Sequence, residues 1–325
     1  MRIRGKLPFH CGLRLADKVS YMSTDNISKM ALFAKLVEAK SFSNAAKQLN
    51  ISTSLVSKQI NSLEQSLGTR LLTRTTRALS LTEAGARFYK HCAHIRSVAE
   101  LATEEIADLQ GGPRGRLKVI VATTFGLLHV APAIPDFLTL YPDITIELTF
   151  YDRVVDIAAE GYDLAIRIGD PVHPGLARHR LAELDWVVCG SPAYFARAGA
   201  LTHPADLLTH NCLFYSYGDG YAQDSVVFTH KGTKIPIAMS GNYQVNNSAA
   251  LCDAAIQGLG VAIVPYFSVG KAIKKGRLEL ALADYVLPTR ALNAVYYAGE
   301  NVPLKIEAFV NFLAQRFNAQ PHWDA

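Results

Sequence analysis

The fold is decided by Ser41-Phe42-Ser43-Asn44-Ala45-Ala46, followed by Ser52-Thr53-Ser54-Leu55-Val56-Ser57-Lys58-Gln59-Ile60, Leu63-Glu64, Arg74-Thr75-Thr76-Arg77 and Leu81-Thr82-Glu83-Ala84-Gly85. These segments predict short helices with serine-rich starts and then two basic strands. A small helical unit of this kind, with a polar helix start and an arginine-bearing ribbon, is suited to duplex DNA.

Apolar periodicity predicts the three helices. Met30, Phe33, Ala34 and Val37 recur at i, i+3, i+4 and i+7, which is typical of one buried helix face. Ser43 is the expected N-cap of the second helix and Ser52 that of the third. Gly68 is the expected stop of the third helix. The side chains expected inside the second and third helices are Ala45, Ala46, Leu49, Val56, Ile60, Leu63 and Leu67. Leu71–Leu72 and Leu79–Leu81 would then form a two-stranded wing.

Positive charge is concentrated in the first quarter of the chain. Residues 1–25 carry five Lys/Arg and two Asp, a net charge of +3. Residues 26–85 carry eight Lys/Arg and three Glu, a net charge of +5, which leaves −3 for the rest because the whole chain carries +5. This asymmetry favours a polyanionic partner at one end. The alternative is that the basic residues only solvate a surface.

Composition limits the other classes. Half of the 325 residues are hydrophobic, enough for real cores, and their number predicts two or three domains. We expect no membrane partner, because no apolar run approaches the ~18 residues of a membrane span. No secretory signal is expected either. Five widely spaced cysteines without a CxxC pair indicate free thiols in a reducing cytoplasm.

A long helix and a hinge follow the wing. Thr82 is the expected cap, and apolar residues then repeat at heptad spacing: Phe88, Cys92, Ile95, Ala99, Ala102, Ile106 and Leu109. This seam predicts a two-chain coiled coil; the alternative is a helix that lies on its own domain. Gly111-Gly112-Pro113-Arg114-Gly115 then breaks the helix.

Beyond the hinge the pattern indicates an open α/β sheet with parallel pairs. Buried strands are expected at 117–121, 144–150 and 164–168, with a helix at 126–140. A second cycle follows, with strands at 186–189, 213–215, 226–228, 235–239 and 261–264 and a helix at 248–258. A strand at 292–297 and a helix at 304–317 end the pattern.

The N-terminal residues resemble the winged helix-turn-helix of the LysR-type transcriptional regulators. The resemblance runs through Phe33, Val37, Ser41-Phe42-Ser43, Ala45-Ala46, Leu49, Ser52, Val56-Ser57, Gln59-Ile60, Leu63-Glu64, Leu67-Gly68, Leu71, Arg74, Arg77, Leu81-Thr82 and Gly85. It continues weakly and in order to about residue 315, for example through Gly161-Tyr162-Asp163-Leu164-Ala165-Ile166-Arg167 and Gly258-Leu259-Gly260. Thr53 and Lys58 stand where the family often has Gln and Arg, so no operator sequence is carried over.

The resemblance implies a multidomain fold: an all-α winged helix-turn-helix head joined by a long linker helix to an α/β effector domain of two subdomains, like a periplasmic binding protein. The family's usual assembly is a homodimer or homotetramer. The expected parts are a flexible extension (1–25), the DNA-binding head (26–85), a dimerising linker helix (82–110), a hinge (111–116) and the effector-binding domain (117–320).

Candidate DNA contacts lie on the third helix and the wing. Short hydroxyl and amide side chains at the first turns of a recognition helix reach base edges in the major groove, and wing arginines suit the minor groove or its phosphates. The candidates are Ser52, Thr53, Ser54, Ser57, Lys58, Asn61, Arg70, Arg74 and Arg77. Taken alone, serine-rich helix starts are common caps and hairpin arginines are usually solvated.

A small-molecule effector is expected at the carboxyl ends of the strands. Thr123-Thr124-Phe125 and Asn246-Asn247-Ser248 open helices there, and two helix starts that face a cleft favour a carboxylate or similar anion. Simple capping is the alternative. Tyr215 and Arg167 are further candidates, although Arg167 lies in an apolar strand and could instead serve in a structural ion pair.

The sequence predicts a regulator rather than an enzyme. It has no HExxH, GxSxG, Walker loop or strand-following GxGxxG, and no metal or cofactor site is expected. The prediction is a cytoplasmic regulator that senses a small molecule and acts at a pseudo-palindromic site on double-stranded DNA. The alternative is a small-molecule binding protein whose basic head docks a protein partner.

Overall fold

The computed structural model describes residues 24–75, 78–108, 111–153, 155–157, 160–169, 175–216, 225–297, 302–317 and 323. Contacts divide the chain between Val98 and Ala99 into two compact units. The N-terminal extension expected at 1–25 lies almost wholly outside the described residues, as does the wing tip at Thr76 and Arg77.

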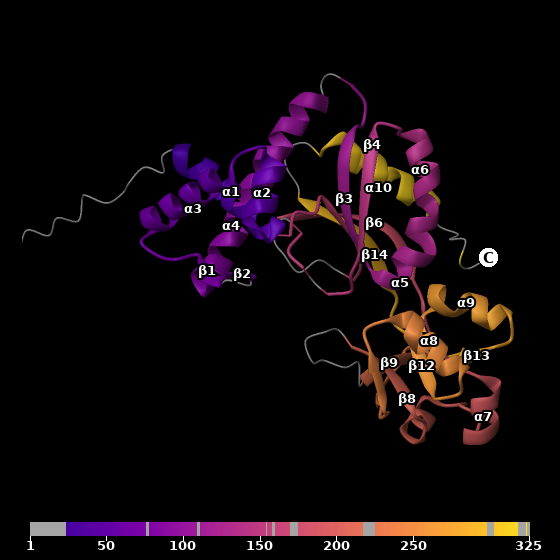
Figure 1. The fold of residues 1–325 in the computed structure, drawn as a ribbon. Coiled ribbons are helices and arrows are strands. Elements are labelled where there is room, and N and C mark those ends of the chain that lie inside the picture. Colours follow the sequence, from indigo (N-terminus) through magenta and orange to yellow (C-terminus); the bar gives the residue numbers. More distant parts are fainter. Residues whose placement is uncertain are drawn as a thin grey trace, which may run out of the picture. The chain divides into compact units, whose positions relative to one another are not determined.

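The first unit is a helical head with a wing (Figure 1). Its elements are α1 (Thr24–Ala39), α2 (Phe42–Leu49), α3 (Thr53–Leu67), β1 (Leu72–Thr75), β2 (Ala78–Leu81) and the start of α4 (Glu83–Asp108). Phe33, Val56 and Ile60 are fully buried in one core with Leu63, as the helical periodicity predicted. The two strands pair antiparallel, from Leu72 opposite Leu81 to Thr75 opposite Ala78.

Two details of the head differ from the sequence prediction. Ser41, not Ser43, caps α2: the Ser41 backbone is extended, and its hydroxyl accepts the N–H of Asn44 at 3.4 Å. Leu49 and Leu67 are 37% and 41% exposed, so neither belongs to the core. Both lie in the last turn of their helix, where the chain turns through left-handed residues at Asn50 and Gly68 and leaves the packed interface.

Hydrogen bonds join the third helix, the wing and the long helix. The Glu64 carboxylate accepts the N–H groups of Leu71 and Leu72 at 2.8 and 3.1 Å. The Thr82 hydroxyl accepts the N–H of Gly85 at 3.0 Å, which confirms Thr82 as the cap of α4, and donates to the Arg70 carbonyl at 2.8 Å. The wing is therefore positioned by side chains of two helices.

The beginning of α4 packs on its own head. Cys92 is fully buried in the head core, and Phe88 and Ile95 pack against it. Arg96 forms a 2.5 Å ion pair with Glu38 of α1. The first part of the predicted coiled-coil seam therefore follows the alternative interpretation, a helix on its own domain. Further along, Val98 is 51% exposed, and Ala99 and Ala102 are exposed as well; the side chains of Ile106 and Leu109 lie outside the described residues.

Among its described residues, the second unit contains two five-stranded sheets and the two-stranded hairpin of β9 (Ser225–His230) and β10 (Thr233–Ala238). The first has the order β4-β3-β5-β14-β6 and is formed by β3 (Gly115–Val121), β4 (Ile144–Phe150), β5 (Leu164–Ile168), β6 (Leu176–Leu184) and β14 (Arg290–Tyr297). β3 pairs parallel with β4 and β5, as predicted. β14 runs antiparallel to both β5 and β6, so the sheet is mixed, and β6 was not predicted at all.

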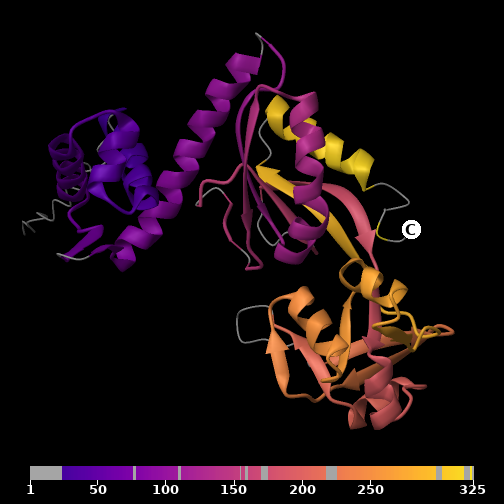
Figure 2. The ribbon, with the colours of Figure 1, turned by 45° about the vertical axis from the view of Figure 1, so that its right-hand side comes forward.

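Helices cover one face of this sheet (Figure 2). They are α5 (Thr123–Phe125), a π-helical turn η1 (Gly126–Val130), a 3-10 turn η2 (Ala131–Ala133), α6 (Ile134–Leu140) and α10 (Leu304–Arg316). The rings of Phe137 in α6 and Phe309 in α10 lie 4.9 Å apart, so the two helices share one core.

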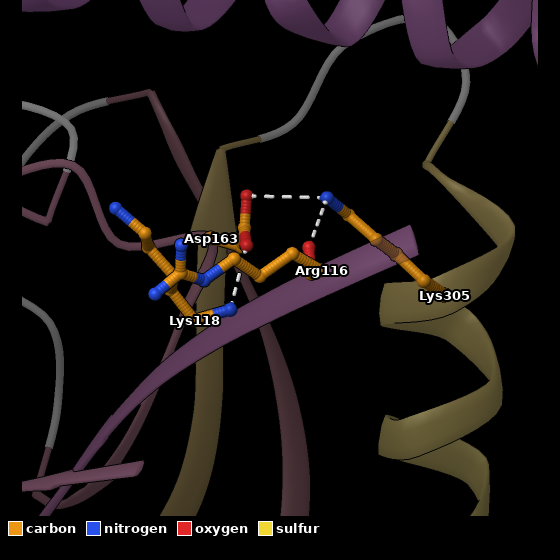
Figure 3. Close-up of polar contacts among 4 residues, drawn as sticks. All are labelled: Arg116, Lys118, Asp163 and Lys305. Atoms are coloured by element: carbon orange, nitrogen blue, oxygen red, sulfur yellow. Dashed lines mark hydrogen bonds and ion pairs between the residues drawn. The ribbon is translucent and has the colours of Figure 1, made fainter. Parts of the chain in front are cut away.

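A buried cation fastens α10 to the sheet (Figure 3). The side chain of Lys305 is 4% exposed, and its Nζ donates to the Arg116 carbonyl at 2.8 Å. It also lies 3.5 Å from Oδ1 of Asp163, whose Oδ2 accepts the N–H of Lys118 at 2.8 Å. A buried ammonium needs such partners, because an unpaired one would be strongly destabilising.

The second sheet has the order β11-β8-β12-β7-β13. The strands of this sheet and the elements around it are, in chain order, β7 (Trp186–Gly190), α7 (Pro192–Ala198), η3 (Pro204–Thr209), β8 (Cys212–Tyr215), β9 (Ser225–His230), β10 (Thr233–Ala238), β11 (Tyr243–Val245), α8 (Ser248–Ile256), β12 (Val261–Pro265), α9 (Tyr266–Lys274) and β13 (Glu279–Ala281). Separate apolar cores lie on its two faces, one including α8 and α9 and the other α7 and the β9–β10 hairpin. The chain crosses between the sheets twice, after β6 and before β14.

Among the described residues, the helices include none with the length and apolar character of a membrane span.

Candidate nucleic-acid interface and ligand cavity

The polar face of α3 is the candidate nucleic-acid interface. Val56, Ile60 and Leu63 point into the head core, which turns the opposite side of the helix to solvent. Ser57 is half-buried, and the other described candidates on α3 and the wing are exposed, namely Ser52, Thr53, Ser54, Lys58, Asn61 and Arg70. The side chains of Ser54, Ser57, Lys58 and Asn61 line one shallow depression on this helix.

The start of α3 is fixed by a serine network. The Ser52 hydroxyl accepts the N–H of Leu55 at 3.2 Å and lies 2.9 Å from the Ser54 hydroxyl. Ser52 is thus the predicted cap. The Ser52 side chain remains exposed, so the same residue can cap α3 and contact DNA.

Sequence reasoning did not single out Leu55, Ser62 and Gln65 of α3. Ser62 and Gln65 line the same depression as Lys58, and Leu55 is 39% exposed. Helical spacing alone could have found Ser62 and Gln65. Of the predicted wing contacts, Arg74 has its backbone in β1 but its side chain lies outside the described residues, as does all of Arg77.

The candidate effector site is a cavity of about 140 Å³ in the second unit. Both sheets and their helices contribute: Thr124, Phe125 and Arg167 come from the first, and Tyr215 and Ser248 come from the second. Four of the predicted effector residues, Thr124, Phe125, Arg167 and Tyr215, therefore line one cavity. Thr124 and Ser248 are each only 7% exposed, so both are buried at the cavity wall.

Thr123, Asn246 and Asn247 were also predicted to contact the effector. None of the three lines the cavity. The N–H of Thr123 donates at 2.7 Å to the carboxylate of Asp152, so a side chain of the protein already occupies that helix start. Asn247 caps α8 by accepting the N–H of Ala250 at 3.1 Å. Capping, the alternative interpretation, holds at α8, whereas at α5 the distant Asp152 carboxylate takes the N–H and no side chain of the helix start acts as a cap. Neither helix start therefore supports an anionic ligand.

Arginines provide the positive charge instead. The lining carries Arg153, Arg167 and Arg290 against one acid, Asp152. The Arg167 guanidinium donates to the Arg153 carbonyl at 3.1 Å, and burial lowers its pKa while the nearby Glu160 raises it. The lining therefore carries three guanidinium groups and one carboxylate, and this positive balance favours an anionic ligand.

Aromatic side chains form another part of the wall. The Arg290 guanidinium lies 5.2 Å from the ring centre of Trp186, and both line the cavity. Phe125 packs edge-on against Phe267 at 5.1 Å, and Trp323 packs against Phe125 from behind at 5.3 Å. A flat apolar body beside a guanidinium is what such walls accommodate. The described residues contain no group of metal-ligand side chains.

Ser248 belongs to the predicted helix start and does line the cavity. The missed cavity residues are Tyr151, Asp152, Arg153, Trp186, Phe267 and Arg290, with the strand residues around them. They come from segments far apart in the sequence and share no local motif. Only the crossing of the chain between the two sheets brings them together.

Family comparisons agree with this geometry. Residues 27–86 match the bacterial regulatory helix-turn-helix protein family of the lysR type, and residues 110–318 match the LysR substrate binding domain. The chain belongs to the LysR family of transcriptional regulators.

Individual relatives extend over nearly the whole chain. An uncharacterized HTH-type transcriptional regulator of Haemophilus influenzae is 34% identical over 282 residues, covering 87% of this chain and 97% of the relative. The structure is similar to CrgA, a LysR-type transcriptional regulator from Neisseria meningitidis (TM-score 0.58, 30% identity, 89% and 98% of the two chains). It is also similar to the full-length Vibrio cholerae virulence activator AphB (TM-score 0.61, 27% identity, 90% and 99%).

Proposed function

We propose that this regulator acts in the cytoplasm as a homodimer or homotetramer whose heads bind the half-sites of a pseudo-palindromic operator. The exposed polar face of α3 is the observation that supports this docking. A symmetric pair of heads matches a pseudo-palindrome. The exposed residues Val98, Ala99 and Ala102 of α4 provide apolar surface for a partner helix.

In this arrangement Ser54, Ser57 and Lys58 lie near base edges, and Ser52, Thr53 and Asn61 border them. Arg70, with the wing arginines Arg74 and Arg77, contacts the backbone or the minor groove. Phosphate contacts of this kind supply affinity and set the register, while the α3 side chains supply sequence preference.

The proposed effector is a small organic anion with a flat apolar body, for example an aromatic carboxylate. Its support is the cavity itself, with three arginines against one aspartate beside the rings of Trp186 and Phe125. Because both sheets line the cavity, a bound ligand would change the angle between them. That change would alter the spacing of the DNA-binding heads in the oligomer.

Matched ligand pairs test the effector class. Full-length protein is titrated with benzoate and with neutral benzamide, and the shift in melting temperature is recorded. Benzoate and substituted benzoates should stabilise the protein, while the neutral amides should not. Stabilisation should fall in Arg290→Gln and Thr124→Val, and should persist in Arg316→Gln, a surface arginine that does not line the cavity. Equal shifts with acids and amides would contradict the anionic assignment.

A DNA-binding measurement distinguishes the proposed function from the rival function, a basic head that docks a protein partner. A regulator should bind a specific duplex with a steep salt dependence. A protein-docking head should show only weak binding without sequence preference.

A further inference from the structure

The face of α3 that is proposed to meet DNA carries one large apolar side chain. Leu55 lies in the first turns of the helix and is 39% exposed, while the next residue, Val56, is fully buried. The capping bond from the Leu55 N–H to Ser52 fixes the backbone there. Leucine at this place makes no large contribution to the head core, so the fold does not explain its size.

Helix geometry places Leu55 beside the polar residues of the interface. Residues three and seven positions apart lie on the same side of a helix, so Leu55 neighbours Lys58 and Ser62. Both of these residues line the shallow depression on the exposed face. The other side chains of this face, from Ser54 to Gln65, offer hydrogen-bond donors or acceptors. Leu55 offers neither.

The major groove has one apolar feature among its base edges, the C5-methyl group of thymine. An exposed leucine between hydroxyl and ammonium groups matches that feature and no polar edge. We propose that Leu55 packs against a thymine methyl group and sets a preference for thymine at one position in each half-site. This proposal rests on the proposed docking of α3 in the major groove.

Deoxyuridine isolates the contact, because it lacks the methyl group and keeps the hydrogen-bonding edges of thymine. A duplex is selected in vitro with the full-length protein, and each thymine in turn is replaced by deoxyuridine in both half-sites. Affinity is measured by fluorescence anisotropy. At one position, removal of the methyl group should lower the affinity of the unsubstituted protein about fourfold for each half-site. This is the expected effect of one buried methyl group.

The decisive comparison is between variants. Leu55→Ala should bind the thymine and deoxyuridine duplexes equally, because the apolar partner is gone, and Leu55→Met should retain the discrimination. Leu67→Ala is the matched control, since Leu67 is 41% exposed in the last turn of the same helix. It should retain full discrimination.

The outcomes separate this proposal from the docking on which it rests. If the protein selects no specific duplex, the docking proposal fails and Leu55 recognition fails with it. If it selects a duplex but no thymine is sensitive, or if Leu55→Ala still discriminates at the sensitive position, the docking stands and the role of Leu55 is refuted.

Discussion

Gly85 lies where the backbone of α4 approaches Leu71 closely, and its replacement by alanine has two opposing effects on stability. Gly85 lies in the first turn of α4, against the start of the wing. A Cβ atom there would lie 1.9 Å from the carbonyl oxygen of Leu71, whereas ordinary contacts are 3.4–4 Å. Leu71 is 1% exposed, and its carbonyl accepts the N–H of Thr82 at 3.0 Å. Alanine therefore forces α4 and the wing apart.

The two effects differ in sign and size. In an unhindered helix, Gly→Ala stabilises by about 0.8–1 kcal/mol. Overpacking against a fixed backbone costs about 1–3 kcal/mol, and weakening the Leu71–Thr82 hydrogen bond adds about 0.5–1.5 kcal/mol. The steric effect dominates, with an expected net loss of about 2 kcal/mol. For a unit of this size that lowers the melting temperature by roughly 8–16 °C.

Differential scanning calorimetry of the full-length protein measures this loss as a downward shift of the transition of the head. Gly112→Ala is the control, because a Cβ at Gly112 meets no atom within 4 Å. The control should change stability by no more than about 0.5 kcal/mol. A Gly85→Ala protein that melts at the same or a higher temperature would refute the packing of α4 against the wing.

Two further predictions concern the second unit and the thiols. Lys305→Met should destabilise the second unit by about 2–4 kcal/mol in urea unfolding, because it leaves the Asp163 carboxylate without its buried partner. Arg316→Met removes a more exposed ion pair and should cost under about 1 kcal/mol; equal losses would argue against the buried contact. In a Cys11→Ser background, Ellman's reagent at pH 8 should label no thiol quickly until the protein unfolds. The remaining four thiols are buried, namely Cys92, Cys189, Cys212 and Cys252. Burial raises their pKa to about 11–12, so almost no thiolate is present at pH 8. Fast labelling of the folded protein would contradict their burial.

The head could be predicted from sequence because its signals are local. The spacing of Val56, Ile60 and Leu63 and the caps at Ser52 and Gly68 lie within one helix. The edge strand β6 escaped prediction because its segment, Leu176–Leu184, has three polar residues in a row, Arg178 to Arg180, and shows neither the polar–apolar alternation nor the continuous apolar run that predicts a strand. α9 escaped because it begins at Tyr266 directly after the buried strand β12, without a side-chain cap.

The ligand cavity could be predicted only in part. Thr124 and Phe125 follow a strand, as expected for the carboxyl edge of a sheet. The helix-start argument was wrong for Thr123, because Asp152, 29 residues further along, takes its N–H. No pattern in the sequence brings Arg290 to Trp186; their proximity depends on the antiparallel return of β14.

The central claim, that the exposed face of α3 and the adjoining wing bind DNA, is tested most directly by the salt dependence of binding. Affinity for the selected duplex is measured by anisotropy between about 50 and about 200 mM salt, a window in which phosphate binding dominates. Lys58→Ala with Arg70→Ala should weaken binding and flatten the logarithmic salt slope by about 0.9 for each phosphate that the protein no longer neutralises. Lys271→Ala with Arg316→Ala, which removes two cations from the second unit, should leave affinity and slope unchanged. If the first pair of substitutions alters neither affinity nor slope, this face of the head does not bind DNA.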